Sequence, residues 1–456
     1  MRRVVKVSRI RIIITIIVVV LTTLLTGCTG KEPNEIAYVV ALGIDSTDDD
    51  NYKITIQYAN TTQISGGASE SGGKAGSEIV DNVTIEAPNI YAGVGLANNI
   101  VSKSFSMSHA KLIVFSKEMA EKGVKDMIET LVRSEEIRPD VFIAVANTTA
   151  NDYLTSVNPE MEVNPAQYYQ LIYQKNQLVG IPDGQLREFF TGLYTDNYDS
   201  ILPVAGVIEG SGGNSQNDDK GQSKDSQNEG SEGSSESLDS FESKSSNEKD
   251  ENDKEKDAEK NTSKYEYDIK NYIGGETTIE KKNKAEAIGA AVFEKDKMVG
   301  ELGEVETEIC KMLKGDYIYS YLTYYNNDTP NIPITVKTTQ QKKPKYKIDT
   351  DKKTVDIELY IESDLYSLPA DYNVENKIED FERDVANYTS STCTEFINNF
   401  TKKYNSDILK LNEKVKYKFL TNNQYNWFKK NVGWSEYKFS VCTNFKVRRT
   451  GLIVRE

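Results

Sequence analysis

Few residues of this chain could carry out metal or nucleophilic chemistry. The 456 residues include one histidine, His109, and four cysteines. A metal centre with several histidine ligands is therefore excluded, and a Ser-His-Asp or Cys-His mechanism would have to use His109. The pattern around His109 predicts a buried strand over 107–115, where a lone histidine usually packs or forms a hydrogen bond. We accordingly predict no catalytic residue, no metal site and no cofactor.

Carboxylates are the other group that could do chemistry, because the chain has 70 aspartates and glutamates. No spacing among them singles out a pair for acid–base work. A glycosidase needs only two carboxylates, and their approach in space cannot be seen in a sequence. A hydrolase acting on cell-wall glycans therefore stays open as an alternative.

The N-terminus has the pattern of a lipoprotein signal peptide. Five basic residues and no acidic one precede residue 12, and an apolar run of 14 residues follows over 12–25. A transmembrane helix needs about 20 residues, so this run has the length of a secretory signal core. Leu25-Thr26-Gly27-Cys28 then has the order of a bacterial lipobox. We predict that residues 1–27 are a signal peptide and that Cys28 carries a lipid on the outer face of the cytoplasmic membrane.

The charge of the chain argues against a nucleic-acid partner. The formal net charge is −15. Removal of residues 1–27 takes away five positive charges and no negative one, which leaves −20. Such an acidic chain repels phosphate, and lysines far outnumber the arginines that grip phosphate with two hydrogen bonds.

Three cysteines remain after processing: Cys310, Cys393 and Cys442. An odd number allows at most one internal disulfide, and no Cys-x-x-Cys pair is present. The pattern places Cys393 on the apolar face of a helix and Cys442 on the polar face of a strand. No disulfide framework is expected.

Two segments have the composition of unfolded chain. Residues 65–77 are rich in glycine and serine, and residues 209–264 contain 16 acidic and 8 basic residues with very few apolar ones. Such segments cannot bury enough surface to offset chain entropy. We predict a flexible loop and an acidic insertion, which is either a tether for a partner or a tolerated surface insertion.

Before the insertion, the pattern alternates between strand and helix periods. It predicts a hairpin of 36–44 with 52–58, a helix over 89–102, a helix that begins after Ser116, and a strand over 141–146. Gly93-Val94-Gly95 lies in the first of these helices. It lacks the third glycine of a dinucleotide fingerprint, so no nucleotide site is predicted there.

After the insertion, the pattern predicts a strand pair at 287–293 and 297–300, a helix over 304–313, and a strand around 357–361. A long amphipathic helix is predicted over 374–404, with Glu382 on its outer face, followed by a strand over 437–447. The fold class is therefore α+β or mixed α/β, with several domains, each a mostly antiparallel sheet packed with helices.

We predict the following division of the chain. The signal peptide spans 1–27, an N-terminal mixed α/β domain 28–205, the acidic insertion 209–264, a linker or part of a small middle domain 265–283, and a C-terminal α/β domain 284–456.

Four blocks of sequence resemble the Ger(x)C family, the lipoprotein C subunits of nutrient germinant receptors in endospore-forming bacteria. The first is EIAYVVALGID at 35–45, close behind the lipobox, and the second is SHAKLIVF at 108–115 with IRPD at 137–140. The third is GAAVFEKDKMVGEL at 289–302, and the fourth is VRRTGLI at 447–453. The blocks follow one another along the whole mature chain.

The resemblance implies a three-domain protein on the outer leaflet of the spore inner membrane. It also implies two integral membrane partners, the A and B subunits of the receptor, and no catalytic residue. Only the lipidated Cys28 carries over as a site. This chain departs from the family pattern in its acidic insertion and in lacking a tryptophan soon after the lipobox.

The expected function is therefore that of a lipid-anchored, non-enzymatic receptor subunit needed for germinant-triggered spore germination. Two alternatives stay open beside it: a substrate-binding lipoprotein of a transporter and a cell-wall hydrolase.

Overall fold

The computed structural model describes residues 13–17, 35–49, 51–59, 80–158, 164–174, 180–195, 197–208, 271–277, 283–325, 333–367, 377–404 and 406–450. The predicted loop 65–77, the insertion 209–264 and Cys28 lie outside these ranges. The labelled helices and strands belong to one unit, residues 1–209 with 269–456. Within the described ranges, none of the helices combines the length and the apolar character needed to cross a membrane.

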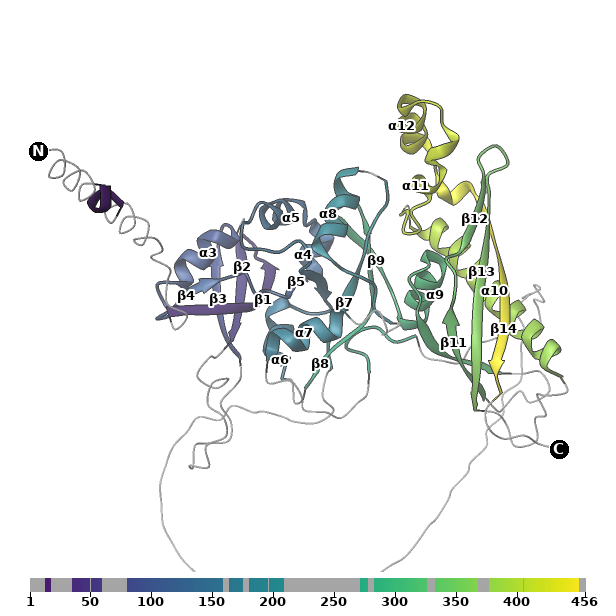
Figure 1. Ribbon diagram of the computed structural model, residues 1–456, viewed down its shortest axis with the longest axis horizontal. Coiled ribbons are helices and arrows are strands. Elements are labelled where there is room, and N and C mark those ends of the chain that lie inside the picture. Colours follow the sequence, from purple (N-terminus) through teal and green to yellow (C-terminus); the bar gives the residue numbers. More distant parts are fainter. Residues whose placement is uncertain are drawn as a thin grey trace, which may run out of the picture. The chain divides into compact units, whose positions relative to one another are not determined.

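The first sheet has nine strands and is built from residues on both sides of the insertion (Figure 1). Its order is β3-β2-β1-β5-β6-β7-β8-β9, and β4 pairs with β1. The strands are β1 (Ile36–Ser46), β2 (Tyr52–Ala59), β3 (Val80–Ala87), β4 (Ser104–Ser106), β5 (Leu112–Ser116), β6 (Phe142–Ala146), β7 (Ile201–Val207), β8 (Ala285–Glu294) and β9 (Lys297–Leu302).

The centre of this sheet is parallel, and only its two flanks are antiparallel. Strand β1 pairs parallel with β5, β5 with β6, and β6 with β7. The hairpin β1–β2 is antiparallel, as predicted, and so is the predicted pair β8–β9. The sheet thus has four antiparallel and four parallel pairings, and what the sequence analysis did not predict is its parallel centre. The central strands β5 and β6 are buried throughout, which is typical of parallel strands covered on both faces.

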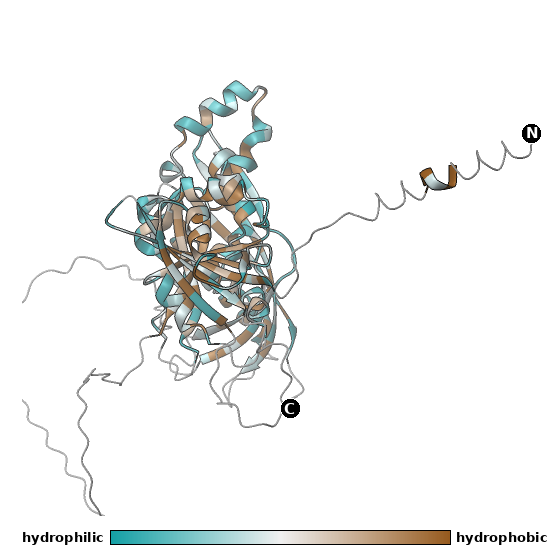
Figure 2. Cartoon of the chain, turned by 90° about the vertical axis from the view of Figure 1, so that its left-hand side faces the viewer, coloured by the Kyte–Doolittle hydropathy of each residue, from teal (hydrophilic) through white to brown (hydrophobic). Residues whose placement is uncertain are grey.

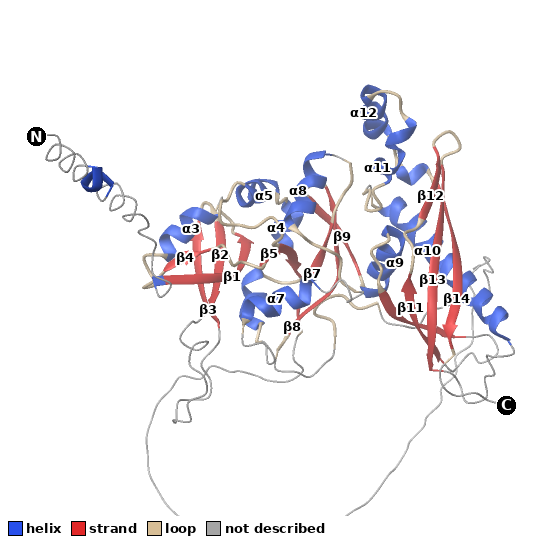
Figure 3. Ribbon diagram, in the orientation of Figure 1, coloured by secondary structure: helices blue, strands red, loops and turns tan. Residues whose placement is uncertain are grey.

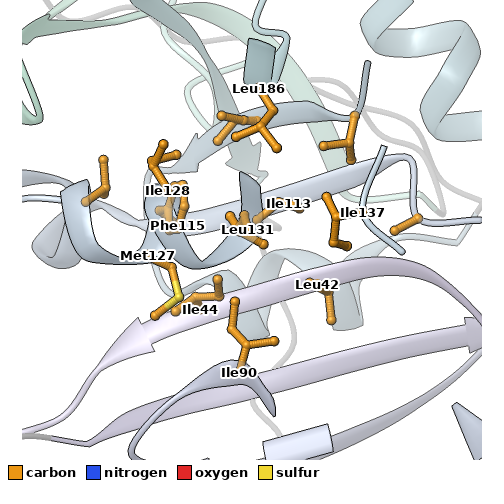
Figure 4. Close-up of a cluster of buried hydrophobic side chains, with 14 of the residues drawn as sticks. Leu42, Ile44, Ile90, Ile113, Phe115, Met127, Ile128, Leu131, Ile137 and Leu186 are labelled. Carbon is orange, nitrogen blue, oxygen red and sulfur yellow. The ribbon is translucent and has the colours of Figure 1, made fainter. Parts of the chain in front are cut away.

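Four helices cover one face of the first sheet: α3 (Ile90–Ala97), α4 (Lys117–Lys122), α5 (Lys125–Val132) and α8 (Leu186–Thr195). Their apolar side chains meet those of the strands in one cluster (Figure 4). Leu42 and Ile44 of β1 and Ile113 and Phe115 of β5 each lie two residues apart. They therefore point to the same face of the sheet.

Two helices, α6 (Ala150–Ser156) and α7 (Pro165–Gln174), cover the opposite face. Their tyrosines are buried with their hydroxyl groups bonded. Tyr153 and Tyr173 share a hydrogen bond of 2.9 Å, and Tyr169 donates to Gln57 of β2. A buried hydroxyl without a partner is costly, so this network fixes both helices against the sheet.

The C-terminal end of β1 holds the start of α6. A Cβ on Gly43 would lie 3.0 Å from Leu154 and 3.2 Å from Ala150, so the glycine lets the helix approach the strand. Asp45 is 4% exposed, and its two carboxylate oxygens accept hydrogen bonds from Ala150 N (2.6 Å) and Asn151 N (3.2 Å). These N–H groups have no acceptor within the helix.

The second sheet has five strands: β10 (Tyr319–Tyr325), β11 (Pro333–Gln340), β12 (Lys345–Asp349), β13 (Thr354–Ser367) and β14 (Lys438–Arg449). The long strand β13 pairs antiparallel with β12 along its first half and with β11 along its second. Strand β14 pairs with it in parallel. Hydrophobic residues, brown in Figure 2, gather on the strands and on the inner sides of the helices.

Two helices, α9 (Glu304–Lys314) and α10 (Ile378–Lys403), pack on this sheet. Their core also includes Val292 of β8 and Leu302 of β9. The last helical segments are α11 (Leu411–Val415), η3 (Lys416–Lys418), α12 (Asn422–Asn431) and η4 (Trp434–Glu436) (Figure 3).

The mixed α+β class with several packed layers is confirmed, and the predicted helices and strands are largely present. Three boundaries differ clearly. The helix predicted over 89–102 ends at Ala97. The predicted strand over 107–115 begins only at Leu112. The helix that Ser116 caps ends at Lys122, because Gly123 adopts a φ of 123°, and α5 starts anew at Lys125.

Residues 284–302, which we assigned to the C-terminal domain, contribute β8 and β9 to the first sheet. The reason is the antiparallel pairing of β8 with β7, which lies before the insertion. The division into three domains stays a prediction.

We predict that Asp45→Ala lowers the free energy of unfolding by about 3 kcal/mol, because two buried N–H groups lose their acceptor. Asp45→Asn should cost less, since its amide oxygen can still accept one bond. Urea unfolding measures the difference. Asp49→Ala, at an exposed position of the neighbouring turn, is the matched control and should change little. An equal effect of the two alanine substitutions would contradict the role of Asp45.

Candidate functional site

The one residue predicted as a modification site, Cys28, lies outside the described residues, so lipid attachment stays a prediction. The other residues singled out from the sequence, namely His109, the three cysteines and Gly93, lie apart from one another. They form no common site. Within the described residues, no group of three or more His, Cys, Asp or Glu side chains could hold a metal ion.

His109 lies on an exposed turn, and the prediction of a buried strand position is wrong. Its Nδ1 lies 3.0 Å from the Ser108 hydroxyl, and its ring meets that of Tyr38 edge-on, with centroids 4.9 Å apart. Strand β5 begins only at Leu112, three residues after His109, so His109 precedes the strand. His109 thus lies beside β1 rather than in a cleft.

The three cysteines of the described residues are free thiols. Cys310 and Cys393 are buried, and burial raises the pKa of each to about 12. A thiol with such a pKa stays protonated and unreactive at neutral pH. The predictions that Cys393 is a core residue and that Cys442 faces outward are both confirmed.

Gly93 of the Gly-Val-Gly motif lies inside α3 rather than in a loop. A Cβ at this position would approach the side chain of Ile54 to 2.8 Å. The glycine therefore serves close packing between α3 and β2.

The main pocket of the described residues has a volume of about 600 Å³ and a mixed polar lining. Its lining includes Tyr198, Asp199, Lys295, Asp407, Asn412 and Trp434. It brings together the segment before β7, the turn between β8 and β9, and the segment that leads into α11. Such a lining could hold a small polar molecule.

Asp199 and Asp407 form the centre of this site, and backbone N–H groups occupy both carboxylates. Asp199 accepts from Lys295 N at 2.9 Å and from Asp407 N at 2.8 Å. Asp407 accepts from Leu411 N and Asn412 N, each at 2.8 Å. The bond from Asp199 N to the carbonyl of Asp407 (3.2 Å) completes a reciprocal pair.

Burial dominates the electrostatics of the pair. Asp407 is 5% exposed, and loss of hydration raises its pKa to about 7, although the bonds from Leu411 and Asn412 act in the opposite direction. Burial also raises the pKa of Asp199. A carboxyl with such a pKa could serve as an acid or base, but here all four oxygens accept hydrogen bonds that hold the chain together.

A second layer of contacts connects the same segments. Lys410 pairs with Glu188 at 2.6 Å and lies 4.2 Å from the centre of the Tyr198 ring. Lys429 donates to the Thr195 carbonyl and to Asn197, each at 3.0 Å. These contacts fasten α8 and the segment after it to the region of α11 and α12.

The sequence carried no signal for this site, because Asp199 and Asp407 are separated by 208 residues. It also misplaced Glu382, which we expected on the outer face of α10. Glu382 is 9% exposed and accepts from Val447 N at 2.9 Å while pairing with Lys446. The helix period is correct, but β14 lies against that side of the helix.

Residues of the first and fourth sequence blocks, and one just after the third, hold structural positions. Asp45 of the first block caps α6. Glu306, just after the third block, accepts from Gly303 N at 3.0 Å and from Asn271 at 3.1 Å at the start of α9, so its side chain reaches back to the N-cap backbone. Arg448 of the fourth block pairs with Glu362 of β13.

Comparison with protein families matches both halves of the chain. The model described as "Spore germination protein N-terminal domain" matches residues 30–207, and the one described as "Spore germination B3/ GerAC like, C-terminal" matches residues 288–451. The two matches flank the acidic insertion and together cover most of the chain. The chain belongs to the GerAC-like family of spore germination proteins, the Ger(x)C family that its four blocks indicate.

Curated relatives come from Bacillus subtilis (strain 168). Spore germination protein KC is 26% identical over 174 residues, which are 35% of this chain and 42% of the relative. YfkR is 29% identical over 145 residues, 32% of this chain and 37% of the relative. Spore germination protein B3 is 26% identical over 148 residues, which are 30% of this chain and 36% of the relative. The chain thus matches less than half the length of each relative.

Among solved structures, the crystal structure of the GerBC protein aligns with 89% of this chain and 96% of its own chain. The TM-score is 0.48 and the sequence identity is 15%.

We predict that part of the pH dependence of stability comes from Asp407. Its pKa is about 3.9 in the unfolded chain and about 7 in the fold. The folded state therefore binds this proton more tightly, and stability falls as pH rises from about 4 to about 7, by up to about 4 kcal/mol. Urea unfolding at pH 5 and pH 8 should show a smaller fall for Asp407→Asn than for the wild type.

Asp407→Asn loses one of its two N–H bonds and should be less stable at every pH, so the slope and not the absolute stability is the readout. Asp356→Asn, at an exposed position of β13, controls for the loss of one charge and should keep the wild-type slope. An unchanged slope in Asp407→Asn would show that this carboxyl does not titrate in the range.

Proposed function

We propose that this chain is a lipid-anchored, non-enzymatic subunit of a nutrient germinant receptor and assembles with two integral membrane subunits, A and B. The observation that carries the proposal is the match of both germination-protein domains on one chain that also bears a lipobox. The names of the relatives support a role in spore germination.

A diacylglycerol at Cys28 would give stable membrane attachment, since two acyl chains suffice where one does not. Ile36 starts β1 only eight residues after Cys28, so the anchor would keep the first sheet close to the bilayer. Docking on integral membrane partners would then be an effectively intramolecular event with a high local concentration.

The arrangement of the polar groups supports a role without catalysis. The carboxylates of Asp199 and Asp407 in the main pocket are engaged by backbone donors. His109 lies on an exposed turn, and two of the three described cysteines are buried. The two carboxylates hold the fold, and we infer that the surface of the protein binds its partners.

We expect spores that carry Cys28→Ala to lose membrane retention of the protein, and their nutrient-triggered germination to slow by at least about tenfold, because the local concentration at the partners falls. The response to non-nutrient triggers should stay normal. Membrane fractionation and the fall in optical density of the spore suspension measure the two effects. Cys442→Ala, at an exposed cysteine outside the lipobox, is the matched control.

An uncleaved signal segment could itself hold the variant in the membrane. A second strain therefore combines Cys28→Ala with a signal peptide that an ordinary signal peptidase removes. Full nutrient germination with the protein released from the membrane would contradict the anchoring role. Impaired uptake of a solute would point instead to a transporter lipoprotein, and altered cortex breakdown to a hydrolase.

A further inference from the structure

Residues 416–430, which comprise η3, the turn after it and most of α12, form a segment that we name the tip. Three large apolar side chains of the tip are exposed to solvent. Leu420 is 95% exposed, Tyr417 78% and Trp427 68%. Single exposed apolar residues are normal, but three within eleven residues mark a binding surface.

The tip is a fixed element, because its other aromatic residues pack inward. The rings of Phe419 and Phe428 lie 4.9 Å apart, and that of Phe419 lies 5.9 Å from Tyr425. Phe428 continues this packing to Trp434, at 6.1 Å, whose indole N–H donates to Asn412. The same segment thus buries one set of aromatic side chains and presents another.

The tip is also basic in a chain that is strongly acidic. No aspartate or glutamate occurs from Lys414 to Ser435, a stretch with five lysines, whereas the whole chain has a net charge of −15. Lys416 and Lys430 are exposed, and Lys416 lies over the ring of Tyr425. The charge of the tip therefore complements an anionic ligand.

We propose that the tip binds directly to the surface of anionic phospholipid membranes. Tyr417, Leu420 and Trp427 enter the interfacial region, where tryptophan and tyrosine place an apolar body in lipid and a polar group in water. Lys416 and Lys430, both exposed, stay at the level of the headgroups with their stems along the apolar boundary, and each adds attraction to an anionic leaflet.

A lipid surface fits these residues better than a protein partner does. Lysine is depleted in protein–protein interfaces, whose cores exclude charge. The three apolar side chains come from η3, the turn and α12, and a fluid interface accepts them without a complementary groove. The contact needs no lipid on Cys28, so it goes beyond the anchoring proposed above and can fail or succeed independently.

The test uses the chain from residue 29 onward, without lipid, since the sheets as the structure describes them begin at Ile36. Co-sedimentation with vesicles of phosphatidylglycerol and phosphatidylcholine is compared with vesicles of phosphatidylcholine alone. We expect binding to the anionic vesicles to be at least about tenfold stronger and to weaken as salt is added.

Two double variants separate the contributions. Leu420→Ser with Trp427→Ser removes apolar contact, and Lys416→Gln with Lys430→Gln removes charge. Each should lower binding to anionic vesicles by about tenfold or more. Ile100→Ser, at a side chain 69% exposed beside α3, is the matched control and should bind like the wild type. Circular dichroism verifies that each variant is folded.

The chain contains two tryptophans, and Trp434 is only 7% exposed, so Trp427 reports on the tip. Anionic vesicles should shift tryptophan emission to the blue, and Trp427→Phe should abolish the shift. Equal binding to both vesicle types, or unchanged binding of both double variants, would overturn the proposal. So would absence of vesicle binding together with tip-dependent binding to detergent-solubilised membrane proteins, which would assign the tip to a protein partner.

Discussion

A buried backbone N–H group needs an acceptor, and in this chain carboxylates from distant segments supply several of them. Asp45 accepts from the start of α6, Asp199 from the backbone of Lys295 and Asp407, and Glu382 from β14. Each N–H left unpaired in the interior would cost about 1–3 kcal/mol. These bonds therefore fix which helix start lies against which strand, and the arrangement of the layers depends on them.

This use of carboxylates also bears on Asp407, whose surroundings otherwise resemble those of an acid–base residue. Asp407 has the buried position and raised pKa expected of a catalytic group, yet its two oxygens are bonded to Leu411 and Asn412. A perturbed pKa marks a functional site only by association, because structural networks perturb pKa values as well. The residues that carry the family resemblance behave in the same way, as Asp45 and Glu306 both cap helices.

The periodicity of apolar residues predicted those helices and strands whose pattern lies within one continuous stretch of sequence. The hairpin β1–β2 and the long helix α10 follow from alternation and from a helical apolar stripe. What it missed depends on contacts between segments. The parallel centre of the first sheet needs crossover connections that periodicity does not encode. Glu382 is buried only because β14 covers it, and Asp199 meets Asp407 across 208 residues. Gly123 could be seen in the sequence, but its positive φ could not.

The charge distribution connects the tip to the anchor. The chain has a net charge of −15, which would become −20 if residues 1–27 are removed as predicted, so an anionic bilayer repels it. This repulsion acts over a Debye length of about 8 Å at physiological salt. The diacyl anchor proposed at Cys28 would offset this repulsion, but it would attach the chain at a single point and leave the body free to rotate. A local basic and apolar contact through the tip would restrict that rotation and select one orientation of the two sheets. Affinity and orientation would then come from two separate parts of the chain, the lipid at Cys28 and the side chains of the tip.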